Sequence, residues 1–423
     1  MGFKKLYLWL IVFYLYWVSF EWLVFSFFTN YALVQLVRLI FDSFPLLFFV
    51  SYLLFWEKKV KLIHLNVILI YFLLLTLLVV SHTFEKTSLF PIIPYFGVTF
   101  RFVPLFLLSG LIDCKTYCYF ITNVKIVYIV HLVFSLIELF FRTFFLKNFL
   151  PPESFFKGFV PTIFVDPGIS STFINTIDFS FFIIGLTILL LYEYRNTRFK
   201  WIVFAVSSLL VLFTFSVASV IVMFIIGLFL IKQRKYLIII LGFSSLFLVL
   251  FNHKIVFIFT GFHSLREYLI VANEYNRVGY FTKLLPHFFT SNLKDILLGY
   301  GVDPLVVDAK LKAYGDIPKM LTFGANNLTL LKDVYWISVL LTQGVSGLGL
   351  IFSMFYLIYR RARMYLVPKI FFFIKLLLLV TLVAGLFNQI FDLKGFCFFF
   401  WITIGIIYKN DDYKTTKSAD CCA

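Results

Sequence analysis

The chain alternates long apolar segments with short polar connections along nearly its whole length. Segments of about 20 apolar residues are long enough to cross the hydrocarbon core of a bilayer as helices. The pattern predicts twelve such helices, near residues 6–28, 32–55, 62–80, 92–112, 119–141, 173–193, 201–215, 217–231, 236–252, 335–359, 369–387 and 396–408.

The stretch 201–231 admits two interpretations. It forms either one long tilted helix or two short helices joined at Phe215-Ser216. Basic residues flank it at 195–200 and at 232–235. Two helices return both basic groups to the same side of the membrane, as the distribution of positive charge requires. We therefore predict two helices.

One polar connection is much longer than the others. Residues 252–334 separate the ninth predicted helix from the tenth. Long connections are uncommon in compact proteins and are usually functional. The chain therefore divides into helices one to nine, one large loop, helices ten to twelve and a polar tail, at residues 1–251, 252–334, 335–408 and 409–423.

The composition supports a membrane protein. Hydrophobic residues make up 62% of the chain and charged residues only 14%, against about 45–50% and about 25% in soluble domains. Sixty Phe and 24 Tyr are more large apolar surface than a water-facing protein of this length hides. This excludes a soluble protein, a disordered chain and a disulfide-stapled secreted module. It predicts an all-α integral membrane protein.

The formal net charge of +16 suggests a nucleic-acid partner, but the positions of the basic residues argue against one. Short loops rich in Lys and Arg stay in the cytoplasm. With the N-terminus inside, every basic cluster falls on the cytoplasmic side. We therefore predict twelve spans, two cytoplasmic termini and a large loop on the outer face. The clusters are Lys4-Lys5, Lys58-Lys59-Lys61, Arg195-Arg198-Lys200, Lys232-Arg234-Lys235, Arg360-Arg361-Arg363 and Lys409-Lys414-Lys417.

Charged residues inside predicted spans are candidates for function, because they are costly in a bilayer. At a rise of about 1.5 Å per residue, six of the seven fall in the outer half of the membrane, and only Lys375 does not. Arg38 and Asp42 have the spacing of a pair on one helix, which is an alternative to function. Arg101 has no carboxylate close in sequence. The seven are Glu21, Arg38, Asp42, Arg101, Glu138, Asp178 and Lys375.

An outward cavity lined by Arg suits a lipid-linked phosphate or pyrophosphate. A guanidinium group holds phosphate oxygens in a planar fork and keeps its charge. The sequence has no ATP-binding loop, no zinc motif of His and Glu, and no dense carboxylate cluster for magnesium. We therefore expect no cofactor and no metal, and a donor that is already activated, such as a sugar on a polyprenyl pyrophosphate.

Three stretches resemble motifs of the O-antigen polymerase and ligase superfamily, which shares this topology of many spans with a large outer loop before the last few. Ser170-Ser171-Thr172-Phe173-Ile174-Asn175 resembles the stretch that opens a middle helix. Arg277, followed by Leu297-Leu298-Gly299-Tyr300-Gly301, resembles the family's loop Arg and Gly-x-Gly. The family also has a block that leads the loop into the next span. In this chain two stretches resemble that block, Asp333-Val334-Tyr335-Trp336 and Gln343-Gly344-Val345-Ser346-Gly347-Leu348.

Two departures within the resemblance favour a polymerase over a ligase. Ligases carry a His where this chain has Asp333, and an Arg between the two short middle helices, where Phe215-Ser216-Val217-Ala218 has none. The resemblance therefore implies a Wzy-type polymerase of the GT-C-like, all-helical fold in the bacterial inner membrane. Such an enzyme transfers the growing glycan from its polyprenyl pyrophosphate to a new lipid-linked repeat unit at the periplasmic face.

Within this hypothesis five residues form the expected site. Arg277 and Arg101 would bind the pyrophosphates with support from Arg38, and Asp333 would be the catalytic base, with His287 as second choice. The expected partners are polyprenyl-pyrophosphate-linked glycans, membrane lipids, a chain-length regulator and a flippase, and not nucleic acid.

Two alternatives use the same features. An O-antigen ligase takes the same donor but transfers the glycan to a lipid A core. A flippase or other transporter of lipid-linked sugar belongs to another class, in which internal repeats and broken midplane helices are common. The crowding of charge toward one face favours the enzyme over the transporter.

Overall fold

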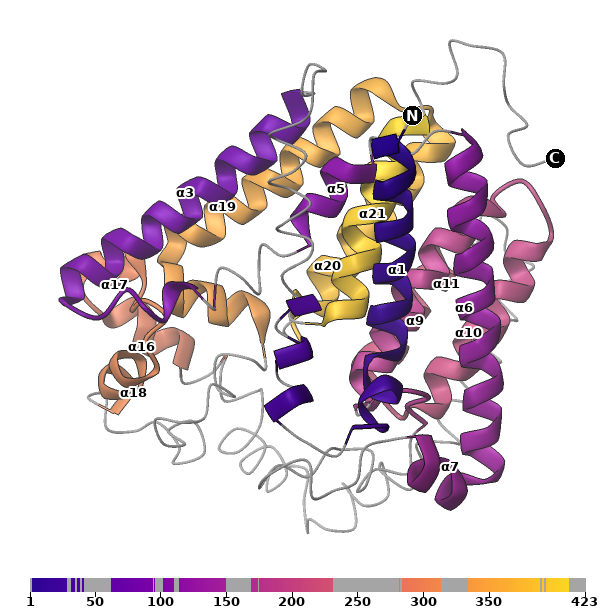
Figure 1. Ribbon diagram of the computed structural model, residues 1–423. Helices are drawn as coiled ribbons and strands as arrows, with labels where there is room; N and C mark the ends of the chain where they lie inside the picture. The colour runs from indigo at the N-terminus through magenta and orange to yellow at the C-terminus, as the bar shows by residue number, and fades with distance from the viewer. Residues whose placement is uncertain are drawn as a thin grey trace, which may run out of the picture.

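The computed structural model is all-helical in the part of the chain that it describes (Figure 1). The predicted helix at 236–252 lies outside that part, as do most of the predicted helix at 32–55 and the tail after residue 410. The described residues are 2–28, 32–34, 36–38, 40–41, 62–93, 95, 102–109, 114–149, 169–173, 175–230, 281, 284–312, 334–388, 390–391 and 393–410.

Among the described residues, five helices are long and apolar enough to cross a membrane, which indicates a membrane-embedded protein. They are α1 (Gly2–Phe25), α3 (Leu62–Glu85), α6 (Cys114–Phe140), α9 (Thr176–Glu193) and α19 (Tyr335–Tyr365). Shorter helices that coincide with predicted spans are α10 (Phe199–Phe213), α11 (Val217–Leu230), α20 (Pro368–Ala384) and α21 (Lys394–Asn410). α5 (Val103–Ser109) lies within the predicted helix at 92–112, of which residues 94, 96–101 and 110–112 are outside the described part. Other short helices are α7 (Arg142–Phe149), α16 (Leu285–Thr290), α17 (Leu293–Leu298) and α18 (Pro304–Lys312).

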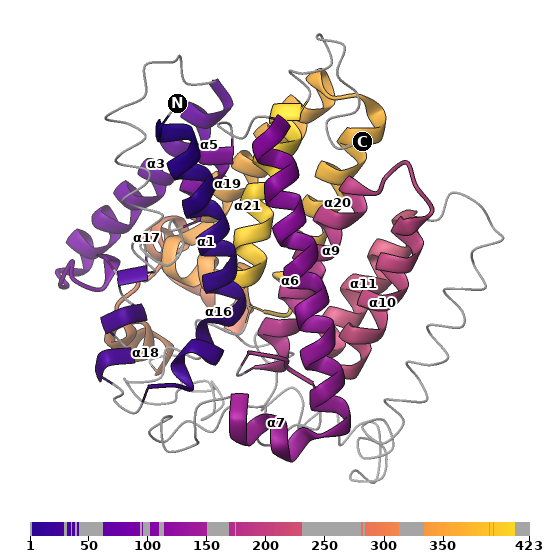
Figure 2. The same ribbon diagram turned by 45° about the vertical axis from the view of Figure 1, so that its right-hand side comes forward.

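The first and last helices of the described chain run antiparallel. Glu21, near the end of α1, pairs with Lys394 at the start of α21, and the Tyr14 and Phe398 rings lie 6.2 Å apart. The start of α1 and the end of α21 therefore share one end of the molecule (Figures 1 and 2). We call the opposite end, where α1 and α6 finish and α9 and α21 begin, the site end.

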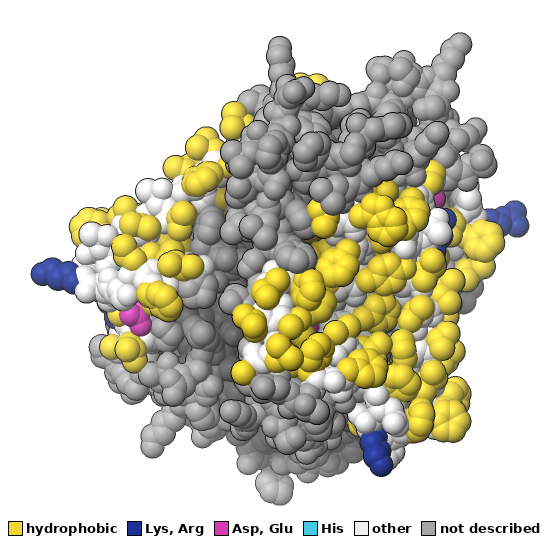
Figure 3. Space-filling view, in the orientation of Figure 1, with side chains coloured by type: hydrophobic (Ala, Val, Ile, Leu, Met, Phe, Trp, Pro, Cys, Tyr) yellow, Lys and Arg dark blue, Asp and Glu magenta, His cyan; other side chains and the backbone are white. Residues whose placement is uncertain are grey.

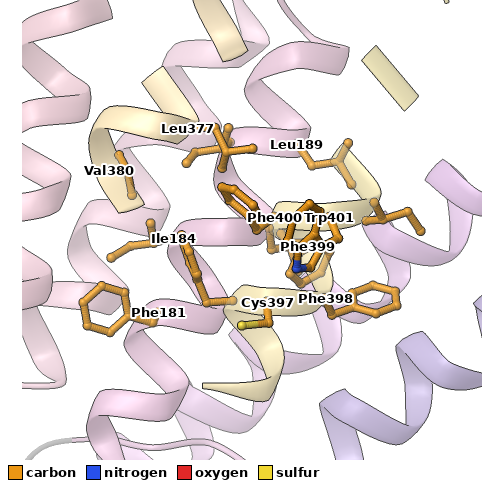
Figure 4. Packing of buried hydrophobic residues seen from close by; sticks show 14 of the residues in the cluster. Phe181, Ile184, Leu189, Leu377, Val380, Cys397, Phe398, Phe399, Phe400 and Trp401 are labelled. Atoms are coloured by element: carbon orange, nitrogen blue, oxygen red, sulfur yellow. The ribbon is translucent and has the colours of Figure 1, made fainter. Parts of the chain in front are cut away.

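The core lies between α9 and α21, which run parallel. A Cβ atom on Gly185 would meet Phe399 at 2.8 Å, and one on Gly395 would meet Phe182 at 2.6 Å, so glycines at these positions let the helices approach closely. Phe181 and Phe399 pack between α9 and α21 (Figure 4). Trp401 packs on the other side of α21, against Tyr71 of α3 and Phe106 of α5 (Val103–Ser109). A helix that is apolar all round, as α9 is, has to be buried on all sides.

The two short helices predicted at 201–231 are confirmed. α10 and α11 form an antiparallel hairpin, since Gly227 of α11 packs on Phe204 of α10. The turn between them contains Phe215 in the left-handed region, at φ 54°. At about 1.5 Å per residue each helix spans about 22 Å, which is shorter than a bilayer core of about 30 Å.

α19 is one span that bends near its start. Gly344 has φ 65° and ψ −170°, so the helix is interrupted about one third of the way along. The long part of α19 packs beside α3, and the two slant away from the bundle of α1, α6 and α9 (Figure 1). The predicted span at 335–359 therefore begins at the expected residue but is kinked and reaches Tyr365.

The surface carries a broad field of hydrophobic side chains, with Lys and Arg at its margins (Figure 3). On α1 and α6, Trp9, Phe13 and Ile129 are exposed although they are large and apolar. Soluble monomers rarely expose continuous apolar areas of this kind. This hydrophobic surface is suited to contact with lipid chains.

Candidate substrate site at the site end of the bundle

A buried carboxylate holds two cations where α1 ends. Glu21 is 3% exposed. Both of its oxygens accept hydrogen bonds from Nζ of Lys394, at 2.9 and 2.8 Å, and Oε1 lies 2.9 Å from Nε of Arg38. Buried charges persist when they are paired in this way. The three residues, which we call the Glu21 triad, join α1, the helical segment 36–38 and α21.

A second buried carboxylate lies at the end of α6. Glu138 Oε2 accepts hydrogen bonds from the backbone N–H groups of Ser170 and Ser171, at 2.8 and 2.7 Å. Arg142, one helical turn away, lies 3.9 Å from the other oxygen. Glu138 thereby satisfies the backbone of the buried turn that precedes α9. A non-helical backbone at membrane depth requires such partners.

The same turn connects to α1 and to a buried histidine. α1 is kinked at Phe20, and the carbonyl oxygen of Ser19 accepts a hydrogen bond of 2.7 Å from the Thr172 hydroxyl. Nδ1 of His131 lies 2.9 Å from the Ser171 hydroxyl, and the imidazole stacks on the Phe20 ring at a centroid distance of 5.0 Å. The Glu21 triad and the Glu138 turn are therefore neighbours, separated by the kink in α1.

The loop segment 284–312 is held against α19 at its bend. The N–H groups of Tyr300 and Gly301 donate to the carbonyl oxygens of Leu341 and Thr342, at 2.6 and 3.1 Å. A Cβ on Gly344 would lie 2.3 Å from the carbonyl oxygen of Leu297. Two stretches that the sequence singles out, around Gly299 to Gly301 and around Gly344, thus contact each other directly.

His82 of α3 fixes the same loop from the other side. Its Nε2 accepts a hydrogen bond of 3.0 Å from the N–H of Val302, and its Nδ1 lies 2.8 Å from the carbonyl oxygen of Ser88. Because Nε2 is the acceptor, the proton of the neutral ring resides on Nδ1, where it donates to Ser88. A Cβ on Gly301 would lie 2.9 Å from Nε2, so only glycine fits there without displacement.

An ionic cluster completes the attachment of α17 and α18 to α3. Nζ of Lys310 donates to both oxygens of Asp295, at 2.7 and 2.8 Å, and to Glu85 at 2.9 Å. Lys294 also pairs with Glu85. Burial alone would lower the pKa of the Lys310 ammonium, but the hydrogen bonds and charges of Asp295 and Glu85 raise it above its ordinary value.

Two of the five predicted site residues are described. Arg38 belongs to the Glu21 triad, and its guanidinium carbon lies 5.4 Å from the centroid of the Trp22 ring. His287 is half-buried on α16, and its carbonyl oxygen accepts from the Thr290 hydroxyl at 2.8 Å. The other three predicted residues, Arg101, Arg277 and Asp333, lie outside the described residues.

The structure also identifies residues that the sequence interpretation did not single out. They are Lys394, which falls just before the predicted helix at 396–408, and the two histidines His131 and His82. The spacing of seven residues between His131 and Glu138 places both on one face of a helix, which is a usable signal. Nothing in the local sequence pairs Lys394 with Glu21.

The arrangement suits binding of an anion. Glu21 binds Nε of Arg38 and so fixes the plane of a guanidinium that is one-third exposed. Arg38 and Lys394 converge on one point of the site end. Across the residues that the structure describes, no group of three or more His, Cys, Asp or Glu side chains is placed to hold a metal ion.

No protein-family model matches the chain, and no curated protein sequence matches it either.

Proposed function

We propose that this protein polymerises lipid-linked oligosaccharide repeat units at the periplasmic face of the bacterial inner membrane. It would cross the membrane twelve times in a GT-C-like arrangement, with both termini in the cytoplasm. Its substrates would be polyprenyl-pyrophosphate-linked glycans, as in O-antigen biosynthesis. A flippase would supply them, and a chain-length regulator would act with the enzyme.

One observation carries the proposal. The two cations of the Glu21 triad converge at the site end of the bundle. The positions of the basic clusters in the sequence predict that this end faces the periplasm. Negative charge develops on a departing pyrophosphate, and fixed cations stabilise it most where water is scarce. The surrounding apolar helix surface fits a polyprenyl chain beside that charge.

The reaction is a transfer from an activated donor. A sugar hydroxyl of the incoming repeat unit attacks the anomeric carbon of the growing glycan, and the bond from that carbon to the pyrophosphate oxygen breaks. The hydroxyl proton passes to a base, for which Asp333 and His287 are the candidates. Arg277 and Arg101 would hold the pyrophosphates, and Arg38 would support them from the Glu21 triad.

The proposal is tested by the length of the glycan in cells. An Arg277→Ala chain expressed at the normal level should leave single repeat units in place of the ladder, because the departing charge loses its partner. Arg360→Ala, in a predicted cytoplasmic cluster, is the matched control and should keep the ladder.

Three other results are informative. A wild-type ladder from Arg277→Ala would remove Arg277 from the site. A bare lipid A core after deletion of the gene would indicate a ligase. An unchanged polymer after deletion would contradict the proposed function itself.

A further inference from the structure

Helices α17 and α18 bury a carboxylate and expose leucines. Asp295 is 3% exposed, whereas Leu293 is 71% and Leu305 is 62% exposed. Asp295 points toward Lys310, whose ammonium donates to both of its oxygens. A segment in contact with water places these residue types the other way round, because carboxylates are rarely buried and leucine usually is.

These helices lie beside the bundle rather than beyond it. In Figure 1, α17 is level with the middle of α1, α16 and α18 are level with its lower half, and α7 lies lower still. The view turned about the vertical axis gives the same levels (Figure 2). A loop domain that projects into the periplasm would lie beyond the helix ends. α16–α18 instead occupy the depth of the outer half of the bundle.

The exposed leucines continue an apolar surface that begins on α3. Leu69, Phe72 and Phe84 are exposed along α3, and Phe90 and Ile93 extend this surface past its end. The Val302 side chain of the loop packs with Leu78 and Ile92 of this region. Hydrophobic side chains mark this end of α3 in Figure 3.

The charges of this region lie where a membrane interface tolerates them. Nζ of Lys294 lies 5.6 Å from the centroid of the Phe84 ring and pairs with Glu85 at the end of α3. Long basic side chains lay their carbon chains along apolar surface and keep their charge at the interface. Lys294 and Lys310 therefore mark the polar boundary of this surface, and the leucines mark its apolar side.

We propose that α17 and α18 are a membrane-interface element, inserted in the outer leaflet beside α3 with Leu293, Leu297 and Leu305 in contact with acyl chains. The occupant of this surface is lipid. On the protein side of the element, Lys310 pairs with Asp295 and Glu85. This inference does not depend on the proposed function.

Spin-label accessibility in liposomes tests it. A nitroxide is attached to Leu293→Cys or Leu305→Cys in a full-length chain whose native cysteines are replaced, and its collisions with oxygen and with a water-soluble nickel complex are compared. Ile129→Cys on α6 is the lipid reference, and Thr197→Cys in the turn before α10 is the water reference; both residues are exposed. At both leucine positions, the ratio of the oxygen to the nickel collision rate should match the ratio at Ile129→Cys.

Two results of the spin-label experiment would contradict the proposal. If the ratio of the oxygen to the nickel collision rate resembles that at Thr197→Cys, the leucines are in water and the proposal is overturned. A label shielded from both reagents would indicate a protein partner and would overturn it too. If the cysteine-replaced chain does not elute as the native protein does, benzoylphenylalanine at Leu297 in the native chain replaces the label. It should form photoproducts with phospholipid in intact membranes, and the absence of such products would also overturn the proposal.

Discussion

Each buried carboxylate at the site end has partners from another part of the chain. Glu21 binds Lys394 and Arg38, and Glu138 binds the N–H groups of Ser170 and Ser171. Leaving a buried charge unpaired costs far more than the pair itself contributes. These side chains therefore decide which helix ends meet.

Replacing Glu21 should loosen this end of the molecule. Glu21→Gln leaves two cations without their shared carboxylate, and we expect the free energy of unfolding to fall by about 3 kcal/mol. Denaturation of the purified protein in detergent micelles measures it. Glu193→Gln is the control, because Glu193 pairs with Lys125 at a more exposed site, where a pair contributes about 1 kcal/mol or less. The Gln carbonyl oxygen still accepts the hydrogen bond that the Tyr117 hydroxyl donates to Glu193. A loss from Glu21→Gln of no more than about 1 kcal/mol would show that the Glu21 triad is not structural.

The bend in α19 depends on a single glycine. At φ 65° any other residue is strained by about 1–2 kcal/mol, and a Cβ on Gly344 would meet the Leu297 carbonyl oxygen. Gly344→Ala should therefore lower the melting temperature and detach the loop from α19. Gly349→Ala, in the same helix, meets nothing within 4 Å and should raise stability by up to about 1 kcal/mol. A Gly344→Ala chain as stable as Gly349→Ala would contradict this explanation of the bend.

At the scale of elements, the positions of the long helices that the structure describes were predictable and their shapes were not. Apolar length and flanking charge located α10 and α11, because both signals lie in the local sequence. The bend of α19 depends on the Leu297 carbonyl, and the kink of α1 at Phe20 accompanies a hydrogen bond from Thr172. Partners this distant leave no mark in the periodicity of a helix.

The α10–α11 hairpin makes a prediction about membrane sides. A reporter fused after Thr197 and one fused after Leu230 should report the same, cytoplasmic side, since the hairpin returns the chain to where it started. Green fluorescent protein should fluoresce at both positions and alkaline phosphatase should be inactive at both. Opposite sides would mean that 201–231 crosses the membrane once.

At the scale of the whole molecule, the gathering of charge at one end was predictable but its contacts were not. Glu21 and Glu138 fall near helix ends in the sequence, and the structure places them on either side of one kink. The Glu21–Lys394 pair joins residues 373 positions apart. Such a pair is set by the topology of the entire bundle. The roles of Arg101, Arg277 and Asp333 stay predictions from the sequence.

Chain growth by the purified protein tests the proposed polymerase most directly. The full-length protein in liposomes receives lipid-linked repeat units, with no ion gradient and no partner protein, and the glycan products are separated by length. We expect polymers of several repeat units, and single units only from Arg277→Ala. Repeat units that cross the bilayer but stay single with the wild-type protein would contradict a polymerase and indicate a transporter.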